Sequence, residues 1–230
     1  MKLVENYKVK KMHLEESFYE FFIELSLNNH KTWFDANRKR YETDVKKPFQ
    51  ALVQEVIERV SAVDNRFSGL TPSDCIFRIN KDIRFSKDKS PYKIFCSAAI
   101  QIGGRKQMSA GGLYFEMGPE NCGVYAGVYM PEKEMLMQIR ENIAARLQDF
   151  TMAVNHKDFK LYFGEVLGEK NKILPPHLKG AAAQEPLIFN KQFYVQHSME
   201  AEETLDGDLA DYITRIWTVS IPFAKILAGE

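Results

Sequence analysis

FRINKDIRFSKDKSPYK, residues Phe77–Lys93, is the stretch at which the chain changes from helical to extended patterning. Positions 77, 79, 83 and 85 are apolar, and positions 78, 80, 82 and 84 between them are polar. A period of two is typical of a half-buried strand, so we expect a strand over Phe77–Phe85. Lys81 interrupts the apolar face and predicts a bulge or an edge position. The composition of Ser86–Pro91 predicts a loop.

Positive charge is concentrated in the same stretch. Phe77–Lys93 contains six Lys or Arg residues and two Asp residues, a local charge of +4 (6 − 2). The whole chain of 230 residues has 31 basic and 31 acidic residues, and therefore no formal net charge. A general nucleic-acid binder needs a broad excess of Lys and Arg, so this balance argues against nucleic acid as a partner. A local anion-binding site remains compatible with it.

Strand patterns continue after this stretch. Ile94–Ile102, Leu113–Met117 and Val124–Met130 have the residue types and lengths of strands, and glycine-containing turns separate them. Connections this short join antiparallel neighbours, so we expect an antiparallel meander. A weaker strand pattern lies within Leu187–Val195.

Helical patterns lie on both sides of these strands, with apolar residues recurring at three- and four-residue steps. The expected helices cover roughly residues 13–25, 33–41, 48–60, 131–147, 157–166 and 209–217. Pro222 predicts a kink or an end in the last helix, and Asn171–Glu185 predicts a surface loop. We therefore expect a single α+β domain over residues 1–230, with residues 1–11 frayed. Its mostly antiparallel sheet comes from the middle of the chain, and N-terminal and C-terminal helices pack on it.

Cysteine usage and hydropathy bear on the cellular setting. Cys75, Cys96 and Cys122 are widely spaced and form no C-x-x-C motif, which predicts neither a disulfide framework nor a zinc site. Three free thiols suit a reducing compartment, so we expect a cytoplasmic protein. No apolar run of about 18 residues or signal-peptide pattern occurs, so we expect no membrane association. We expect neither a metal nor a cofactor.

Two sequence words carry a family resemblance. NNHKTWFDANRKRYE (Asn28–Glu42) and FRINKDIRFSKDKSPYK resemble the signatures of domain of unknown function (DUF) family 2461, conserved hypothetical proteins of bacteria and fungi. GVYMPE (Gly127–Glu132) lies where that family has a glycine-rich strand ending in Tyr-x-Pro. The chain has Lys81 where the family often has Arg, and only Lys179-Gly180 where the family tends to carry a Lys-x-Pro-Arg-Gly loop. The resemblance implies the family's fold and supplies no catalytic residue.

The polar face of the expected strand is the first candidate site. Arg78, Asn80, Asp82 and Arg84 would point the same way, about 6–7 Å apart between alternate residues. Two guanidiniums flanking a carboxylate suit a phosphate or carboxylate ligand, and Lys93 would join them. Asp82 would orient an arginine or act as a base, and it is the one candidate for a catalytic role. The alternative is a structural ladder of Arg–Asp pairs.

An aromatic strand face is the second candidate site. Tyr125 and Tyr129 flank Gly127 on the same face of their expected strand, and Tyr114 on the preceding strand would adjoin them. Such a face can stack a base or a sugar. The alternative is a helix packed over the sheet, with Gly127 relieving the crowding.

Trp33 and Arg38 would provide a side wall for the basic strand, and plain amphipathic packing of their helix is the alternative. We expect a protein that binds an anionic small molecule or phosphoester through the basic strand and loop, with catalysis left open. The second hypothesis is an interaction or scaffold module whose basic edge docks an acidic partner or a second copy of the chain.

Overall fold

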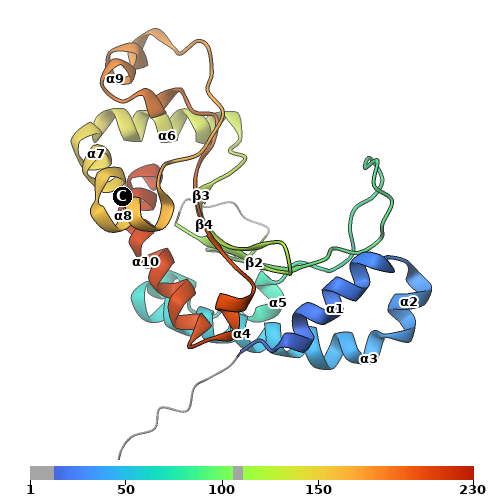
Figure 1. Cartoon of the computed structure of the whole chain (residues 1–230). Helices are drawn as coiled ribbons and strands as arrows, with labels where there is room; N and C mark the ends of the chain where they lie inside the picture. The colour runs from blue at the N-terminus through green and yellow to red at the C-terminus, as the bar shows by residue number, and fades with distance from the viewer. Residues whose placement is uncertain (1–12, 106–110) are drawn as a thin grey trace, which may run out of the picture.

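The computed structural model describes residues 13–105 and 111–230, so the predicted frayed start, residues 1–11, lies outside the described residues. A four-stranded antiparallel sheet of order β1-β2-β3-β4 lies at its centre. The strands are β1 (Cys96–Ile100), β2 (Leu113–Met117), β3 (Cys122–Val128) and β4 (Phe193–Met199). Helices precede, interrupt and follow the sheet in sequence (Figure 1). The predicted α+β fold is therefore confirmed.

The helices fall into three groups along the chain. Before the sheet come α1 (Glu16–Leu27), α2 (Lys31–Ala36), α3 (Arg38–Arg40), α4 (Lys47–Val63) and α5 (Pro72–Cys75). Between β3 and β4 lie α6 (Lys133–Ala145), α7 (Leu147–Asn155), α8 (Lys157–Phe163) and α9 (Lys179–Gln184). After β4 comes α10 (Leu209–Ala228), which continues past Pro222. The loop predicted for Asn171–Glu185 contains α9, because its alanine-rich KGAAAQ segment favours helix.

The N-terminal helices follow their apolar stripes. α1 buries Phe18, Phe21 and Phe22 at the predicted three- and four-residue spacing. It ends before Asn28, whose side-chain amide donates to the Glu24 carbonyl at 3.0 Å and closes the last turn. A π-helical turn over residues 41–46 joins α3 to α4, and Pro48 lies in the first turn of α4.

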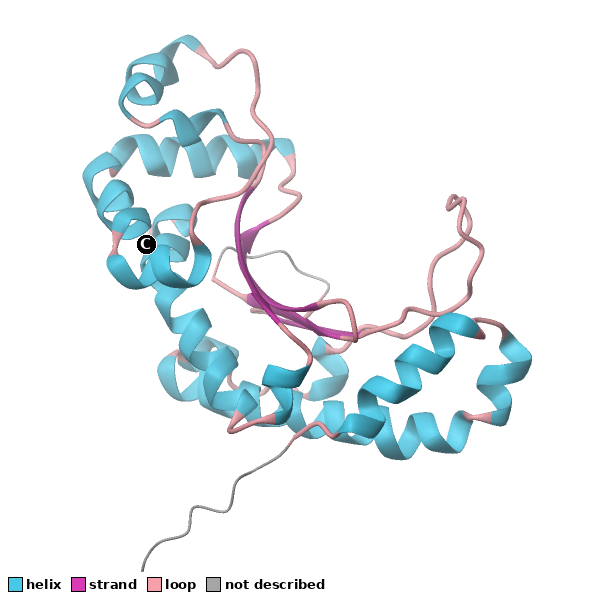
Figure 2. Ribbon diagram, in the orientation of Figure 1, coloured by secondary structure: helices cyan, strands magenta, loops and turns pink. Residues whose placement is uncertain are grey.

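The two faces of the sheet differ in what covers them. Phe115 of β2 is fully buried and lies 5.8 Å from Phe49 of α4, measured between ring centroids. α10 packs along the same face, chiefly against β3. Tyr114 and Tyr125 point to the opposite face and are only partly buried. That face is concave, and none of the described helices lies across it (Figure 2).

Helix α10 is tied to the start of β2. Trp217 is 1% exposed and packs edge-to-face on Phe67, with ring centroids 5.7 Å apart. Its indole Nε1–H donates to the Gly111 carbonyl at 3.1 Å. Satisfying this buried donor fixes the helix against the sheet, since an unpaired indole N–H would be costly there.

The strand predicted over Phe77–Phe85 is wrong. Only the beginning of this segment pairs with the sheet. The Phe77 N–H donates to the carbonyl of Ser97 in β1 at 3.0 Å. A single bridge joins Asn80 to Tyr92, and residues 81–90, which we name the basic arm, project away from the sheet (Figure 1).

Side chains of the basic arm bond its own backbone instead of a neighbouring strand. Asp82 Oδ1 accepts from the Arg84 N–H at 3.2 Å, and Asp88 Oδ1 accepts from the Ser90 N–H at 2.9 Å. Such local bonds compete with a β-ladder, which explains why the alternating pattern did not produce a strand. Phe85, on the expected buried face, is 95% exposed.

No described helix is long and apolar enough to cross a membrane. The three cysteines are free and buried. Burial raises the pKa of the Cys75 thiol to about 11, so it stays protonated at neutral pH and is a poor nucleophile.

Candidate functional site

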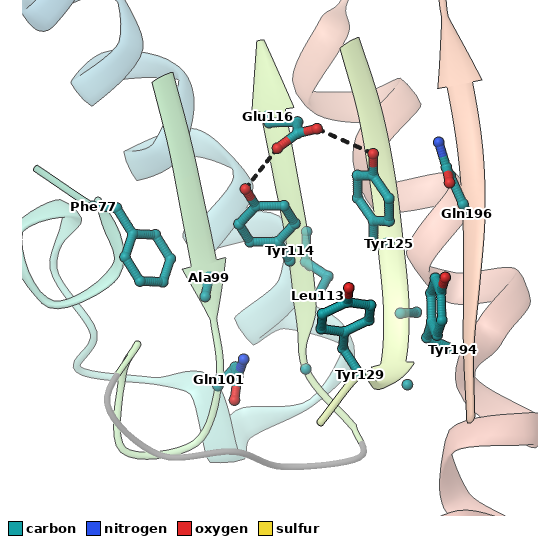
Figure 3. A pocket seen from close by; sticks show the side chains of 13 residues that line it. Phe77, Ala99, Gln101, Leu113, Tyr114, Glu116, Tyr125, Tyr129, Tyr194 and Gln196 are labelled. Atoms are coloured by element: carbon teal, nitrogen blue, oxygen red, sulfur yellow. Dashed lines mark hydrogen bonds between the residues drawn. The ribbon is translucent and has the colours of Figure 1, made fainter. Parts of the chain in front are cut away.

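The concave face of the sheet holds a cavity of about 530 Å³, which we name the tyrosine hollow. Five aromatic rings line it: Phe77, Tyr114, Tyr125, Tyr129 and Tyr194 (Figure 3). Three polar side chains also line it: Gln101, Glu116 and Gln196. These residues come from all four strands and from the edge segment before β1, so the site depends on the whole sheet.

Small residues form the floor of the hollow. Ala99, Gly112, Ala126 and Gly127 lie between the rings. Gly127 has a positive φ of 95°, and a Cβ atom there would lie 2.2 Å from the Phe193 carbonyl oxygen. No other residue fits this backbone without a shift, so this position requires glycine.

Glu116 is held between two tyrosines on neighbouring strands. The Tyr114 hydroxyl donates to Glu116 Oε2 at 2.7 Å, and the Tyr125 hydroxyl donates to Oε1 at 3.1 Å (Figure 3). Gly123 is the cross-strand partner of Glu116, and a Cβ atom there would lie 3.1 Å from the Tyr125 ring. Because Gly123 has no side chain, the Tyr125 ring can lie over it and reach the Glu116 carboxylate.

Both of these tyrosines remain hydrogen-bond donors at neutral pH. Burial, followed by the charge of Glu116, raises the pKa of Tyr125 above its ordinary value. Burial is also the main cause that raises the pKa of Tyr114, and Glu116 adds to it. A carboxylate offers about four lone-pair sites, so two hydroxyl donors leave it able to accept further bonds from a ligand.

A second aromatic pair lines the hollow next to β4. Tyr129 and Tyr194 meet edge-to-face with their ring centroids 5.1 Å apart, and Tyr129 is 60% exposed. The structure therefore places Tyr125, Tyr129 and Gly127 around one cavity, as the strand pattern predicted, together with Tyr114. The alternative of a helix packed over Gly127 on this face does not occur among the described helices.

The predicted anion-binding residues do not converge. Arg84 pairs with Asp82 through Nη2 and Oδ2 at 2.6 Å, and both side chains are exposed on the basic arm. The Arg84 guanidinium also lies 5.7 Å from the Phe85 ring centroid. Neither Arg84 nor Asp82 lines the tyrosine hollow. The docking of an acidic partner by this arm stays a prediction.

Arg78 borders a different cavity. This cavity, of about 240 Å³, lies between the edge segment, the π-helical turn and α4, and its basic residues are Lys46, Arg78 and Arg105. No Asp or Glu lines it. Arg78 forms no ion pair within residues 13–105 and 111–230, whereas Lys46 pairs with Glu42 at 2.9 Å.

Lys93 lies close to the aromatic wall. Its ammonium nitrogen is 5.3 Å from the Phe77 ring centroid and 5.8 Å from that of Phe95. Burial lowers the pKa of Lys93, and the charge of Glu116 acts in the opposite direction. Lys93 has no ion pair in the described part of the chain and does not line the hollow.

Trp33 and Arg38 serve the packing of the N-terminal helices. The ring centroids of Trp33 and Phe21 lie 5.6 Å apart. Arg38 pairs with Asp35 at 2.5 Å, and its guanidinium lies over the Phe34 ring. Neither residue lines the hollow. Their expected role as a side wall for the basic strand stays a prediction.

One group of side chains has the composition of a metal site. His13, Glu55 and Asp208 bring their ligand atoms within 4.8 Å of one another. Arg59 donates to Glu55 at 2.5 Å and to Asp208 at 2.6 Å, so its guanidinium already pairs with both carboxylates. The group is accounted for as an ion-pair network between α4 and the start of α10.

The sequence did not indicate Glu116, Tyr194 or Gln196 as site residues. Glu116 lies on β2, and Tyr194 and Gln196 lie on β4. Only the cross-strand register brings them together: Tyr125 pairs with Tyr114 on one side and Gln196 on the other. The alternation of Tyr194 and Gln196 with buried neighbours on β4 was the available signal.

Comparison with protein-family models matches residues 17–225 to a conserved hypothetical protein family, DUF2461. Comparisons with curated proteins and with solved structures gave no match. The match spans nearly the whole chain and includes every residue of the tyrosine hollow. The protein therefore belongs to the DUF2461 family.

Proposed function

We propose that this protein binds a small organic molecule in the tyrosine hollow. The observation that carries the proposal is a concave sheet face, not covered by any described helix, that holds five aromatic rings and a carboxylate bonded by two of them. Its volume of about 530 Å³ falls within the roughly 300–1,000 Å³ typical of small-molecule sites. An exposed aromatic surface of this kind has no role in the core, which lies on the other face.

The residues suggest how such a ligand is oriented. The rings of Tyr125, Tyr129 and Tyr194 offer apolar contact to a ligand, while Gln196 and Glu116 supply hydrogen-bonding groups. Sites for drug-sized ligands combine these two elements, with few polar groups fixing the orientation. The floor glycines allow a ligand to approach the backbone closely.

A ligand screen tests the proposal. Neutral, cationic and anionic metabolite probes are tested by saturation-transfer NMR against the wild-type protein and against Tyr125→Ala and Tyr194→Ala variants. We expect at least one probe whose affinity falls about tenfold or more in both variants, because stacking on one ring is worth about 1–3 kcal/mol. Phe85→Ala, an exposed ring on the basic arm, is the control and leaves the affinity unchanged.

The proposal fails if every probe that binds keeps its affinity in both hollow variants, or if no probe binds at all. Circular dichroism of each variant separates a lost contact from a lost fold.

A second candidate function rests on the 240 Å³ cavity beside Arg78. Three basic residues and no acid line it, and Arg78 is not paired within the described residues. We propose phosphate or a phosphoester as its ligand, since a guanidinium binds two phosphate oxygens at once. At about 100 times its dissociation constant, phosphate would stabilise the fold by about 2.7 kcal/mol, a measurable thermal shift. Arg78→Ala abolishes the shift and Arg84→Ala retains it; equal shifts in both variants would refute this candidate.

A further inference from the structure

Among the described residues that line the tyrosine hollow, the formal charge is negative: Glu116 is the only Asp, Glu, Lys, Arg or His among them. Within the described chain Glu116 forms no ion pair, and its two partners are tyrosine hydroxyls, which are neutral. A carboxylate that is partly withdrawn from water and forms no ion pair creates a negative potential in the cavity, and the charge of Lys93 acts on it from outside the lining residues.

The rings add to this potential. The face of an aromatic ring carries partial negative charge, and a cation within about 6 Å of the ring centroid is attracted to it. Tyr114 lies 5.5 Å from Tyr125 and 6.1 Å from Phe77 between centroids, so neighbouring rings border a common space (Figure 3). Tyr129 and Tyr194 border it from the β4 side.

We propose that the ligand of the tyrosine hollow is a small organic ammonium ion, whose positive group lies among the rings next to Glu116. The inference rests on the proposed function and specifies the chemical class of its ligand. A carboxylate or phosphate ligand would instead meet both Glu116 and the negative ring faces, and nothing among the lining residues would compensate its charge.

The protein's own Lys93 already shows this mode of contact. Its ammonium group lies over Phe77 and Phe95 without a carboxylate partner in the described chain. Phe77 also lines the hollow, so one wall of the cavity is a ring that accepts an ammonium ion on its surface. Lys93 itself lies outside the lining residues of the hollow.

A pair of isosteric probes tests the charge alone. Choline carries a trimethylammonium group, and 3,3-dimethyl-1-butanol has the same shape with a neutral carbon in place of the nitrogen. Both are titrated into the full-length protein and followed by NMR. We expect choline to bind about tenfold more tightly than the neutral alcohol, because cation–π and carboxylate attraction act on choline only.

The Glu116→Gln variant locates the effect. Glutamine keeps a carbonyl oxygen that accepts a tyrosine hydroxyl but removes the negative charge, so the fold is retained. We expect choline affinity to fall about tenfold while the affinity for the neutral alcohol stays the same. Asp82→Asn on the basic arm removes an equal charge outside the hollow and is the matched control, with no effect on either probe.

Three results would overturn the inference: equal affinity for the two isosteres, a choline affinity that Glu116→Gln leaves unchanged, or no choline binding at all. The first two, or a neutral or anionic probe that binds and is lost in Tyr125→Ala, would leave the proposed binding function intact with another ligand class. Absence of binding by every probe of the wider screen would remove both proposals together.

Discussion

The basic arm and the tyrosine hollow treat charge in opposite ways. In the arm, Lys81 pairs with Asp88 at 2.8 Å and Arg84 pairs with Asp82 at 2.6 Å, so neighbouring charges neutralise one another in solvent. In the hollow, the carboxylate of Glu116 meets two hydroxyl groups and no cation among the lining residues that the structure describes. The arm carries more charged residues, but the hollow presents the stronger electrostatic potential to a ligand.

Enclosure explains the difference. An exposed ion pair is worth about 0–1 kcal/mol, and salt screens its field within about 10 Å. A carboxylate held by two hydroxyls in a concave aromatic surface is fixed in place and less screened. Charge density along a sequence is therefore a weaker indicator of a site than one charge in a preformed cavity.

Among the substitutions that distinguish the hollow from the arm, we expect Gly127→Ala to lower the free energy of unfolding most. Its Cβ atom would lie 2.2 Å from the Phe193 carbonyl oxygen, and the φ of 95° is unfavourable for alanine. We expect the free energy of unfolding to fall by about 3 kcal/mol or more in urea titrations. Gly207→Ala, at a φ of 80° with no atom within 4 Å, is the control and should cost about 1–2 kcal/mol. Equal costs would show that the hollow's floor adapts to a side chain.

The second-largest expected difference between the hollow and the arm is the pH at which each stops contributing to stability. The pKa values of Tyr114 and Tyr125 are raised by burial, so their contribution is present below the ordinary value of about 10 and is lost as pH rises above it. The pKa values of Asp82 and Asp88 are lowered, chiefly by bonds from Arg84 and Lys81, so the arm's contribution is lost as pH falls below about 3.9.

Tyrosinate absorbance measured together with circular dichroism tests the alkaline limb. We expect Tyr114 and Tyr125 to ionise only as the secondary structure is lost, because burial raises the pKa of both. Ionisation of all tyrosines near their ordinary pKa in a folded protein would contradict it.

A smaller effect is expected when the hydroxyl donors to Glu116 are removed. Tyr125→Phe and Tyr114→Phe each delete one hydrogen bond to a charged acceptor and should each cost about 1 kcal/mol of unfolding free energy. Because both bonds end on one carboxylate, a cycle that combines Tyr125→Phe with Glu116→Gln should show a coupling energy. Strict additivity would mean that the carboxylate is not held by these hydroxyls in solution.

The smallest effect is expected from Arg84→Ala on the arm. The Arg84–Asp82 pair is exposed, so urea titrations should show no measurable change in the free energy of unfolding. Ligand binding in the tyrosine hollow should also be unaffected. A large loss of stability would show that the arm packs against the body of the protein more firmly than its contacts indicate.

Local patterns were sufficient to predict much of the fold. The helical stripe of α1 and the alternation in β2 come from neighbours in sequence, and both elements formed where the sequence indicated. The strand expected over Phe77–Phe85 failed because Asp82 and Asp88 bond the arm's own backbone, which hydropathy does not record.

The candidate site was only partly predictable for a related reason. Tyr125, Gly127 and Tyr129 lie on one strand or directly after it, so their common face could be seen in the sequence. The contact between Tyr125 and Glu116 depends on the pairing of Glu116 with Gly123 across two strands. Cross-strand register is a property of the assembled sheet, and no single strand encodes it.

The bond from Trp217 to the Gly111 carbonyl gives the molecule a built-in optical reporter. The chain contains two tryptophans, and the other, Trp33, lies in α2 among the N-terminal helices. Gly111 directly precedes Gly112, which lines the hollow. In a Trp33→Phe protein, the emission of the remaining indole would follow the hydrogen bond at the first residues of β2. Occupancy of the hollow could then be read by fluorescence, without a label and without knowledge of the ligand.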